Sequence, residues 1–209
     1  MTEAPGPYRT TRRSWLAAGL ALPVSRAFTA PAGLSATWDG DNIHISAPQL
    51  RFLSGKPLER LKDGAAVTFF SQLSISTDQF ATVFRRLPER FVVSYDLWEE
   101  KFSVNRLSGA PRSASHLAAG AAEAWCLESM VVSASGLAPE RPFWLRFELR
   151  ASDARDEAAI VGEPGINITR LIEFFSRRPR SEQPQWTLEA GPLELRALRR
   201  TEHRGPRTG

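Results

Sequence analysis

Few residues of this 209-residue chain have the types and spacing of acid–base or nucleophilic catalysts. Of its three histidines, His44 falls on the polar face of an expected strand and His203 in the C-terminal tail. The third, His116, follows Ser115 within an expected helix over 113–127. Adjacent side chains of a helix point about 100° apart and do not face each other, so the two do not form a catalytic dyad. Ser115 is interpreted as a helix cap, and no catalytic residue is predicted.

The chain also lacks the spacing of metal ligands. It has no His-x-His and no cysteine pair, because Cys126 is its only cysteine. Cys126 lies in the apolar segment AAEAWCLESM, which is typical of a buried thiol. One acidic cluster could hold calcium, but it lacks the glycine and the alternating oxygen ligands of a calcium loop (Asp153, Asp156, Glu157). No metal and no cofactor are predicted.

Four large apolar residues occupy register positions that polar residues otherwise take: Phe70, Val92, Trp98 and Trp144. Two interpretations fit this pattern. Helices could bury this second sheet face, or the face could present an aromatic groove to an apolar ligand or a partner protein. The second interpretation makes Phe70, Trp98 and Trp144 the candidate binding residues. Together with the missing catalytic motifs, it favours a non-enzymatic binding module.

Dispersed carboxylates offer a different chemistry. Asp96, Glu99 and Glu148 fall on expected strands or in the turn between them, and folding could bring them into one cleft. Carboxyls whose pKa values are pushed apart can act as general acid and general base. The alternative prediction is therefore a hydrolase-type enzyme whose site is assembled only in three dimensions.

Period-two alternation of apolar and polar residues predicts the strands that position these side chains. The expected strands are 43–47, 67–76, a hairpin over 90–106, 143–149, 186–190 and, after a stop at Gly191-Pro192, 193–195. Such alternation means one buried and one solvated face, and hence antiparallel sheets.

Two segments have the period of helices. Residues 113–127 are rich in alanine, and residues 167–178 begin with a potential N-cap, Asn167. The second segment has its apolar residues on one face: Ile168, Leu171, Ile172 and Phe175. A shorter helical turn is expected at 58–62. These elements predict an α+β, β-rich fold, an antiparallel β-sandwich-like domain over 34–198 with two inserted helices.

Most of the positive charge lies at the ends of the chain. The formal net charge is +4, yet residues 1–27 hold four arginines and residues 196–209 hold five. The body between them has 18 basic and 21 acidic residues, so it offers no basic face for phosphates, and no nucleic-acid partner is expected. The tail 199–209 is predicted to be disordered, and its arginines could contact an anionic membrane surface weakly.

The first residues have the order of an export signal. Residues 11–17 (TRRSWLA) resemble the twin-arginine pattern through Arg12 and Arg13, and a short apolar stretch with small residues follows. We predict a signal peptide over 1–27, with an alternative cut after Ala32, and a periplasmic or otherwise exported location in a bacterium. No apolar run approaches the ~20 residues that cross a bilayer, so no transmembrane segment is expected.

A series of hydrophobic motifs runs through about residues 36–197. They are Leu-Glu-x-Leu-x-x-Gly at 58–64, the hairpin FVVSYDLWEEKFSVNR, a helix ending in AEAW, the strand PFWLRFELR and the helix LIEFFSRR. In this order they resemble the bacterial exported proteins of the domain of unknown function 4390 family. The resemblance implies a small envelope protein without an established activity, and it supplies no functional residues.

Overall fold

The computed structural model describes residues 33–152, 158, 160–162, 165–178 and 183–198. The predicted signal over 1–27, the alternative cut after Ala32 and the tail 199–209 lie outside these ranges. So does the acidic cluster of Asp153, Asp156 and Glu157.

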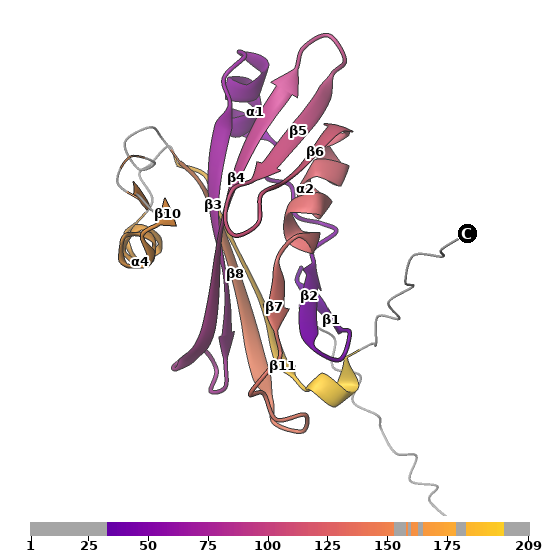
Figure 1. Ribbon diagram of the computed structural model, residues 1–209, viewed down its shortest axis with the longest axis vertical. Helices are drawn as coiled ribbons and strands as arrows, with labels where there is room; N and C mark the ends of the chain where they lie inside the picture. Colours follow the sequence, from indigo (N-terminus) through magenta and orange to yellow (C-terminus); the bar gives the residue numbers. More distant parts are fainter. Residues whose placement is uncertain (1–32, 153–157, 159, 163–164, 179–182, 199–209) are drawn as a thin grey trace, which may run out of the picture.

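A six-stranded antiparallel sheet forms the centre of the molecule (Figure 1). Its strand order is β11-β8-β3-β4-β5-β6, so the long strands β3 and β4 lie in the middle. The bounds are β3 Val67–Ser76, β4 Val83–Asp96, β5 Lys101–Arg106, β6 Arg112–Leu117, β8 Phe143–Ala151 and β11 Gln185–Leu193. The predicted hairpin over 90–106 is confirmed, because β4 pairs with β5 from Phe91 to Asp96.

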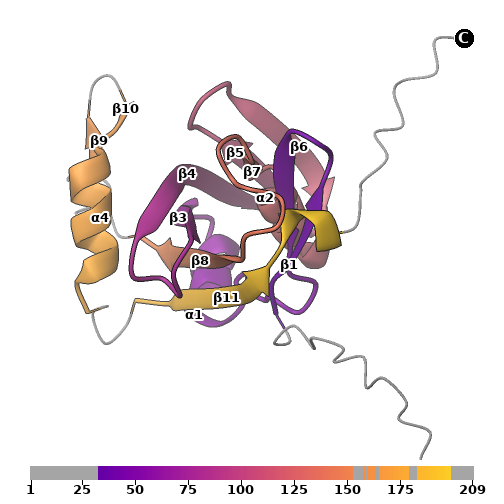
Figure 2. The same ribbon diagram turned by 90° about the horizontal axis from the view of Figure 1, so that it is seen from below.

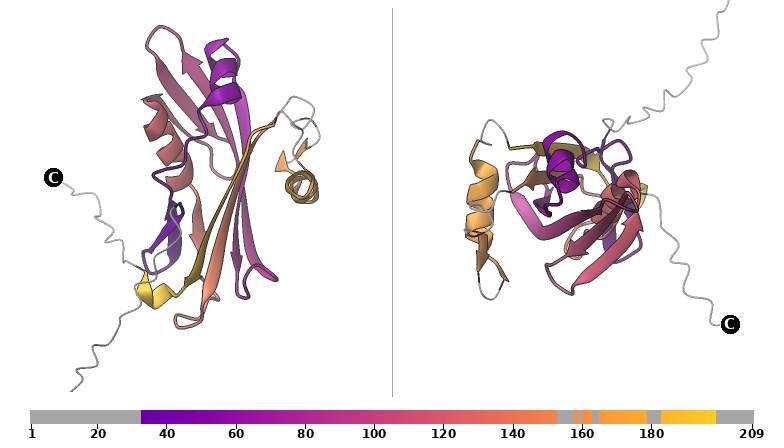
Figure 3. Two further views of the ribbon diagram at one scale, coloured as in Figure 1. Left: turned by 180° about the vertical axis from the view of Figure 1, so that it is seen from behind. Right: turned by 90° about the horizontal axis from the view of Figure 1, so that it is seen from above.

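A second layer covers one face of this sheet, the inner face (Figures 1 and 3). It consists of a three-stranded sheet of order β1-β2-β7 and two helices. Its elements are β1 Ser35–Trp38, β2 Asn42–Ser46, α1 Gly55–Lys62, α2 Ala119–Glu128 and β7 Val131–Ser133. Buried apolar side chains of both layers form one core, including Phe69, Phe91 and Phe147 from the large sheet. The predicted α+β, β-sandwich-like architecture is therefore confirmed.

The opposite, outer face of the large sheet carries a smaller cover. The helix α4, Ile168–Ser176, lies against it with the two short strands β9, Val161–Gly162, and β10, Gly165–Ile166. Figure 2 shows α4 on one side of the large sheet and the three-stranded sheet on the other. A second apolar cluster fills the space beneath α4: Phe70, Ile160, Leu171, Phe174 and Phe175.

Strand β3 departs from the expectation of one buried and one solvated face, because all ten of its residues are buried. Its outer polar side chains reach neighbouring strands: Gln72 Nε2 donates to Glu148 Oε2 at 3.4 Å, and Ser74 Oγ donates to the Arg146 carbonyl at 3.4 Å. A central strand has long side chains of its neighbours on both sides. Polar residues at alternate positions therefore do not indicate exposure there.

The predicted helix over 113–127 is wrong in its first part, which forms β6 and pairs with β5. Serine and histidine are weak helix formers, and the sheet edge satisfies the backbone groups that a helix would otherwise pair. The pairing shifts register here, and His116 takes a left-handed φ of 59°. Ser115 therefore caps no helix, and the N-cap of α2 is Ala118.

The predicted helix over 167–178 is confirmed as α4 with shorter bounds. Asn167 is its N-cap, since Oδ1 accepts the Arg170 N–H at 3.0 Å. Its buried face is corrected to Leu171, Phe174 and Phe175, whereas Ile168 is 47% exposed. Its Phe174 and Phe175 rings lie 4.6 Å and 5.5 Å from the guanidinium of Arg150 on β8. No helix within the described ranges is long and apolar enough to cross a membrane.

The predicted stop at Gly191-Pro192 is wrong, because β11 continues through both residues to Leu193. Its pairing with β8 is irregular between Ala190 and Leu193. As an edge strand, β11 tolerates a proline that donates no ladder hydrogen bond. The strand predicted at 193–195 is instead the end of β11 followed by the short helix η1, Leu195–Ala197.

Candidate functional site

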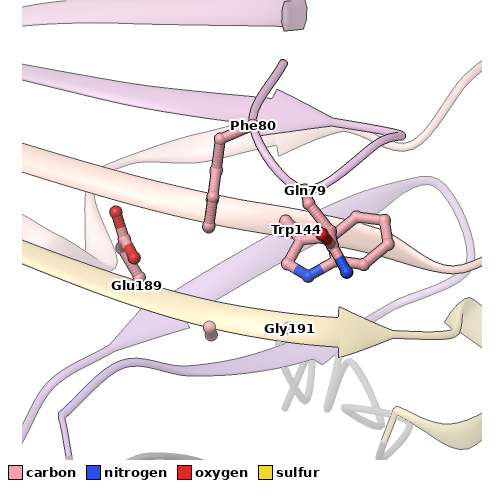
Figure 4. Close-up of a pocket in the computed structure, with 6 residues that line it drawn as sticks. Gln79, Phe80, Trp144, Glu189 and Gly191 are labelled. Atoms are coloured by element: carbon pink, nitrogen blue, oxygen red, sulfur yellow. The ribbon is translucent and has the colours of Figure 1, made fainter. Parts of the chain in front are cut away.

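An open pocket of about 310 Å³ lies on the outer face, where the turn between β3 and β4 approaches β8 and β11. We call it the Trp144 pocket. Its lining residues are Gln79, Phe80, Trp144, Glu189, Ala190 and Gly191. Figure 4 shows Phe80 and Gln79 extending from the turn toward Trp144 of β8, with Glu189 extending from β11.

Trp144 is held directly against the backbone of Gly191. A Cβ atom at Gly191 would lie 2.3 Å from the indole Cδ1, far inside any contact distance. The φ of Gly191 is also +147°, which side chains rarely adopt. Gly191 lies opposite Trp144, in the part of β11 where the pairing with β8 is irregular. The irregular pairing leaves room for the indole ring against the backbone.

Two residues of the turn over the pocket have unfavourable backbone dihedral angles. Gln79 and Phe80 are consecutive non-glycine residues with φ of 50° and 73°. Each such residue costs on the order of 1 kcal/mol. Asp78 holds the turn, because its Oδ1 accepts the Thr82 N–H at 2.6 Å and its carbonyl accepts the Ala81 N–H at 3.0 Å. The hydroxyl and the N–H of Thr82 lower the pKa of Asp78.

Arg146 of β8 links the turn to the edge strand. Its guanidinium lies 4.4 Å from the centre of the Phe80 ring, and its Nε donates to Glu189 Oε1 at 2.7 Å. Arg146 and Glu189 face each other across β8 and β11, the arrangement in which opposite charges support a sheet. The ring contact holds Phe80 at the pocket, and the ion pair balances the negative charge of the Glu189 carboxylate.

The lining of this pocket is suited to binding. It combines two aromatic rings with one amide and one carboxylate. Aromatic rings supply contact area, and the amide can donate and accept hydrogen bonds. The lining contains no hydroxyl, thiol or imidazole, and its one carboxylate, that of Glu189, is held in an ion pair with Arg146.

The three predicted binding residues do not share one groove. Trp144 lines the pocket described above. Phe70 is fully buried beneath α4, where its ring centre lies 5.7 Å from that of Phe174. Trp98 stands in the turn between β4 and β5 with 97% of its surface exposed. The buried-face interpretation thus describes Phe70, whereas Trp144 is half-buried at the pocket and Trp98 faces solvent at a separate place.

Phe70 is covered because α4 is fixed to the sheet by a buried arginine. Arg150 donates to the backbone carbonyls of Phe174, Phe175 and Arg177 at the C-terminal end of α4. It also donates to Gln185 Oε1 of β11 at 2.5 Å. A cation at the C-terminal end of a helix is favoured by the helix dipole.

Trp98 is presented by a turn with well-defined hydrogen bonds. Asp96 Oδ1 accepts the N–H groups of Trp98 at 2.8 Å and of Glu99 at 3.0 Å. These two bonds, that of Glu99 first, lower the pKa of Asp96. The turn therefore holds an exposed indole at the end of the β4–β5 hairpin.

The carboxylates of the alternative prediction lie apart. Glu148 faces Gln72 in the middle of the large sheet, and Gln72 also pairs with Pro88 of β4. Asp96 lies eight residues beyond Pro88 on the same strand, roughly 26 Å at the usual strand rise. Burial raises the pKa of Glu148, with the nearby arginines opposing the shift.

The exclusion of a Ser115–His116 pair is corrected, because it depended on the helix that the structure replaces with β6. His116 Nδ1 lies 3.0 Å from Ser115 Oγ, and His116 Nε2 lies 3.2 Å from Glu99 Oε2. The His116 and Glu99 side chains are 70% and 52% exposed. Neither side chain lines the Trp144 pocket, and acyl transfer needs a site with oxyanion donors from which water is excluded.

Cys126 is buried in α2, as predicted. Burial raises the pKa of its thiol far above the usual range, so the thiol stays protonated and is a poor nucleophile and ligand. Within the described ranges, no three His, Cys, Asp or Glu side chains are grouped so that they could hold a metal ion.

A second pocket, of about 130 Å³, lies between α2 and the loop after β2. The buried Glu123 lines it, and its Oε1 accepts the N–H groups of Phe52 at 2.7 Å and Leu53 at 2.8 Å. Arg51 lies 3.6 Å from the other oxygen. Glu123 therefore has a clear structural task, which is to hold the segment that leads into α1.

Sequence reasoning missed Gln79, Phe80, Glu189 and Gly191. In the sequence, Glu189 has the pattern of an ordinary polar residue of an alternating strand. Gly191 has the pattern of the end of that strand. One signal was present, because the turn sequence TDQFAT contains an aromatic residue but no glycine, proline or asparagine. Asp78 favours a turn, but Gln79 and Phe80 do not favour the left-handed positions that they occupy, which indicates a separate role for their side chains.

A comparison of the sequence with models of known protein families finds no match, and the same holds for curated proteins and for solved structures. The resemblance to the domain of unknown function 4390 family therefore stays a prediction.

Proposed function

We propose that this protein is a non-enzymatic binding module whose ligand site is the Trp144 pocket. The observation that carries the proposal is that two segments with unfavourable backbone dihedral angles, one in β11 and one in the β3–β4 turn, both lie next to the indole ring of Trp144. Gly191 removes a Cβ that would collide with Trp144, and the strained residues Gln79 and Phe80 place their side chains over it. Strained backbone persists where surrounding structure or function compensates for it, and it is concentrated at ligand sites.

Partner binding through Trp98 is a second candidate function. An indole that is 97% exposed on a hydrogen-bonded turn has little to contribute to folding. Tryptophan is enriched among the residues that dominate protein interfaces, and a preformed turn lowers the entropy lost on binding. The two candidates use different ends of the large sheet and can operate together.

The hydrolase-type alternative has less support from the geometry. Asp96 lies roughly 26 Å along β4 from Pro88, which stands level with Glu148 across β3, whereas the two carboxyls of a glycosidase lie within about 10 Å of each other. Glu99 is nearer to Asp96, but it stands in solvent beside His116.

The binding function is tested by nuclear magnetic resonance on the full chain with ¹⁵N-labelled indole groups. The six indole N–H signals are assigned by single Trp→Phe variants. Three probes of different chemistry are added in turn: methyl β-glucopyranoside, tetramethylammonium chloride and toluene. We expect at least one probe to shift the signal of Trp144 saturably, while the signal of the inner-face residue Trp186 stays in place. If none of the three probes moves the Trp144 signal, the pocket is not a ligand site of this kind.

We also propose that the chain is exported to the periplasm through the twin-arginine route. The sequence pattern around Arg12 and Arg13 supports this proposal. Replacing both arginines with lysine is expected to leave the precursor in the cytoplasm, as measured by fractionation and immunoblotting. Normal processing and periplasmic recovery of the double variant would contradict this route.

A further inference from the structure

The chemistry of the Trp144 pocket narrows the class of its ligand. We infer that the pocket binds the ring of a neutral sugar, an inference that rests on the proposed binding function. It follows from three features: the aromatic rings, the polar groups beside them, and the ion pair that closes one side.

The two rings suit a flat ligand face that carries C–H groups. Trp144 and Phe80 both line the pocket, and the indole of Trp144 is fixed from behind by Gly191. The face of an aromatic ring carries partial negative charge, and the axial C–H groups of a pyranose carry partial positive charge. A sugar ring therefore packs on such a face better than a ring of similar size without polarised C–H groups.

The polar groups of the pocket match the hydroxyls at the edge of a sugar. The amide of Gln79 offers donors and an acceptor, and the carboxylate of Glu189 offers acceptors. A sugar hydroxyl donates one hydrogen bond and accepts others, so it can satisfy both side chains. A purely apolar ligand would remove water from this amide and this carboxylate without replacing their hydrogen bonds, which is unfavourable.

The ion pair between Arg146 and Glu189 disfavours a charged ligand. Arg146 Nε lies 2.7 Å from Glu189 Oε1, and its guanidinium already covers the Phe80 ring. A cationic ligand would approach a neutralised carboxylate and a neighbouring guanidinium, and so would gain little from the aromatic rings. An anionic ligand would likewise find the guanidinium of Arg146 already paired with Glu189.

The size of the pocket limits the contact to one ring. A volume of about 310 Å³ lies at the lower end of the range for small-molecule sites. With a single ring bound in an open pocket, we expect a dissociation constant of about 1 mM for a monosaccharide. A longer glycan would bind through one of its residues and extend into solvent.

The test is an NMR titration of the full chain with methyl β-glucopyranoside, methyl α-mannopyranoside and methyl N-acetyl-β-glucosaminide, each up to 50 mM by design, about fifty times the expected dissociation constant. We expect saturable shifts of the Trp144 indole signal with at least one of the three sugars. Tetramethylammonium chloride and toluene serve as probes of the other two chemistries and are expected to give none.

Two variants and one control locate the binding. Gln79→Gly removes the amide but keeps the left-handed backbone, so it preserves the fold and is expected to weaken sugar binding at least about fivefold. Trp144→Ala removes the indole that reports binding, so its titration follows the backbone N–H signals of Gln79 and Gly191, and this variant is expected to abolish binding. Leu107→Ala, which changes an exposed side chain after β5, at the far side of the large sheet from β11, is the matched control and is expected to leave the affinity unchanged.

Each outcome separates the two proposals. If tetramethylammonium or toluene shifts the Trp144 signal and no sugar does, the sugar inference is overturned and the binding function stands. If no probe shifts the signal, both are overturned. Sugar binding that survives Trp144→Ala and Gln79→Gly would also overturn the assignment to this pocket.

Discussion

Arg146 and Arg150 stand four residues apart on β8, on the same face of the sheet, and each lies over a phenyl ring. Arg150 is buried with Phe70 beneath α4, in what we call the closed half of the outer face. Arg146 is 37% exposed beside Phe80 and Trp144, in what we call the open half. Similar residue types thus form part of the core in one half and the lining of a pocket in the other.

The difference lies in what each arginine binds. The guanidinium of Arg150 reaches three carbonyls at the end of α4, and these bonds attach a whole helix to the sheet. The guanidinium of Arg146 reaches one carboxylate on the neighbouring strand and the ring of Phe80 in a turn, so it attaches no helix that would bury Trp144. An aromatic residue on a sheet face therefore does not by itself indicate a binding site, because a segment that covers it makes it part of the core.

The largest expected effect is on the closed half. Arg150→Met leaves buried carbonyls of α4 without donors, and we expect the free energy of unfolding to fall by about 3 kcal/mol. Arg146→Met is the matched variant four residues away, and a partly exposed ion pair contributes less than about 1 kcal/mol. Urea denaturation of both variants measures the difference. An equal decrease in the free energy of unfolding of the two variants would contradict the distinction between the closed and the open half.

The second prediction concerns the contact between Trp144 and the backbone of Gly191. Gly191→Ala is expected to lower the free energy of unfolding by about 2 kcal/mol, because the new Cβ collides with the indole. It should also displace the ring and abolish ligand binding. Gly109→Ala is the control, since Gly109 also has a positive φ, of 67°, but open space around it. An indole signal for Trp144 that is unchanged in Gly191→Ala would contradict the contact.

A smaller effect is expected for two buried carboxyls. Burial raises the pKa of Glu89, on the inner face of β4, to about 7, against the influence of Arg106. Burial also raises the pKa of Glu148, on β8 between the two halves. A raised pKa means that the folded state holds the proton more tightly than the unfolded chain. The folded state is therefore favoured most below pH 4.5, the ordinary value, and loses stability as the pH rises toward 7.

Glu89→Gln is accordingly expected to remove part of this loss, with a gain on the order of 1 kcal/mol at pH 8. Glu148→Gln should show a change of the same sign and smaller size, because its side chain is less completely buried. Thermal denaturation from pH 5 to pH 8 checks both variants. A stability of Glu89→Gln that falls with pH as steeply as that of the unmodified protein would contradict the cause given for this shift.

The smallest predicted change is an increase in the free energy of unfolding. Gln79→Gly relieves a left-handed residue and is expected to raise the free energy of unfolding by about 0.5–1 kcal/mol while it weakens ligand binding. This opposite response is typical of a residue kept for function. A variant that is less stable than the unmodified protein would indicate that the Gln79 side chain supports the fold.

The sequence was sufficient for elements whose pattern is local. Alternation at Phe91, Val93 and Tyr95 predicts the β4–β5 hairpin, and Asn167 marks the start of α4. It failed at 113–117, where an alanine-rich continuation suggests a helix but pairing with β5 decides the structure. Local preferences are weak compared with the hydrogen bonds that a sheet edge offers.

The pocket depended on longer-range information. Trp144 could be singled out because it breaks the alternation of β8, but Phe70 breaks the alternation of β3 in the same way. Only the position of α4, fixed by Arg150, decides which of the two is covered. Gln79 and Glu189 carry no pattern of their own, because their role arises from the approach of a turn and an edge strand that are distant in sequence.

The contrast between the closed and the open half is tested most directly by hydroxyl-radical footprinting of the folded protein, with oxidation located by mass spectrometry. Oxidation of an aromatic side chain requires contact with solvent, so both halves are measured in one experiment. We expect oxidation of Trp144 and protection of Phe70 and Phe174, with protection of Trp144 appearing when a ligand is bound. Oxidation of Phe70, or protection of Trp144 equal to that of Phe70 in the free protein, would contradict the division of this face into core and site.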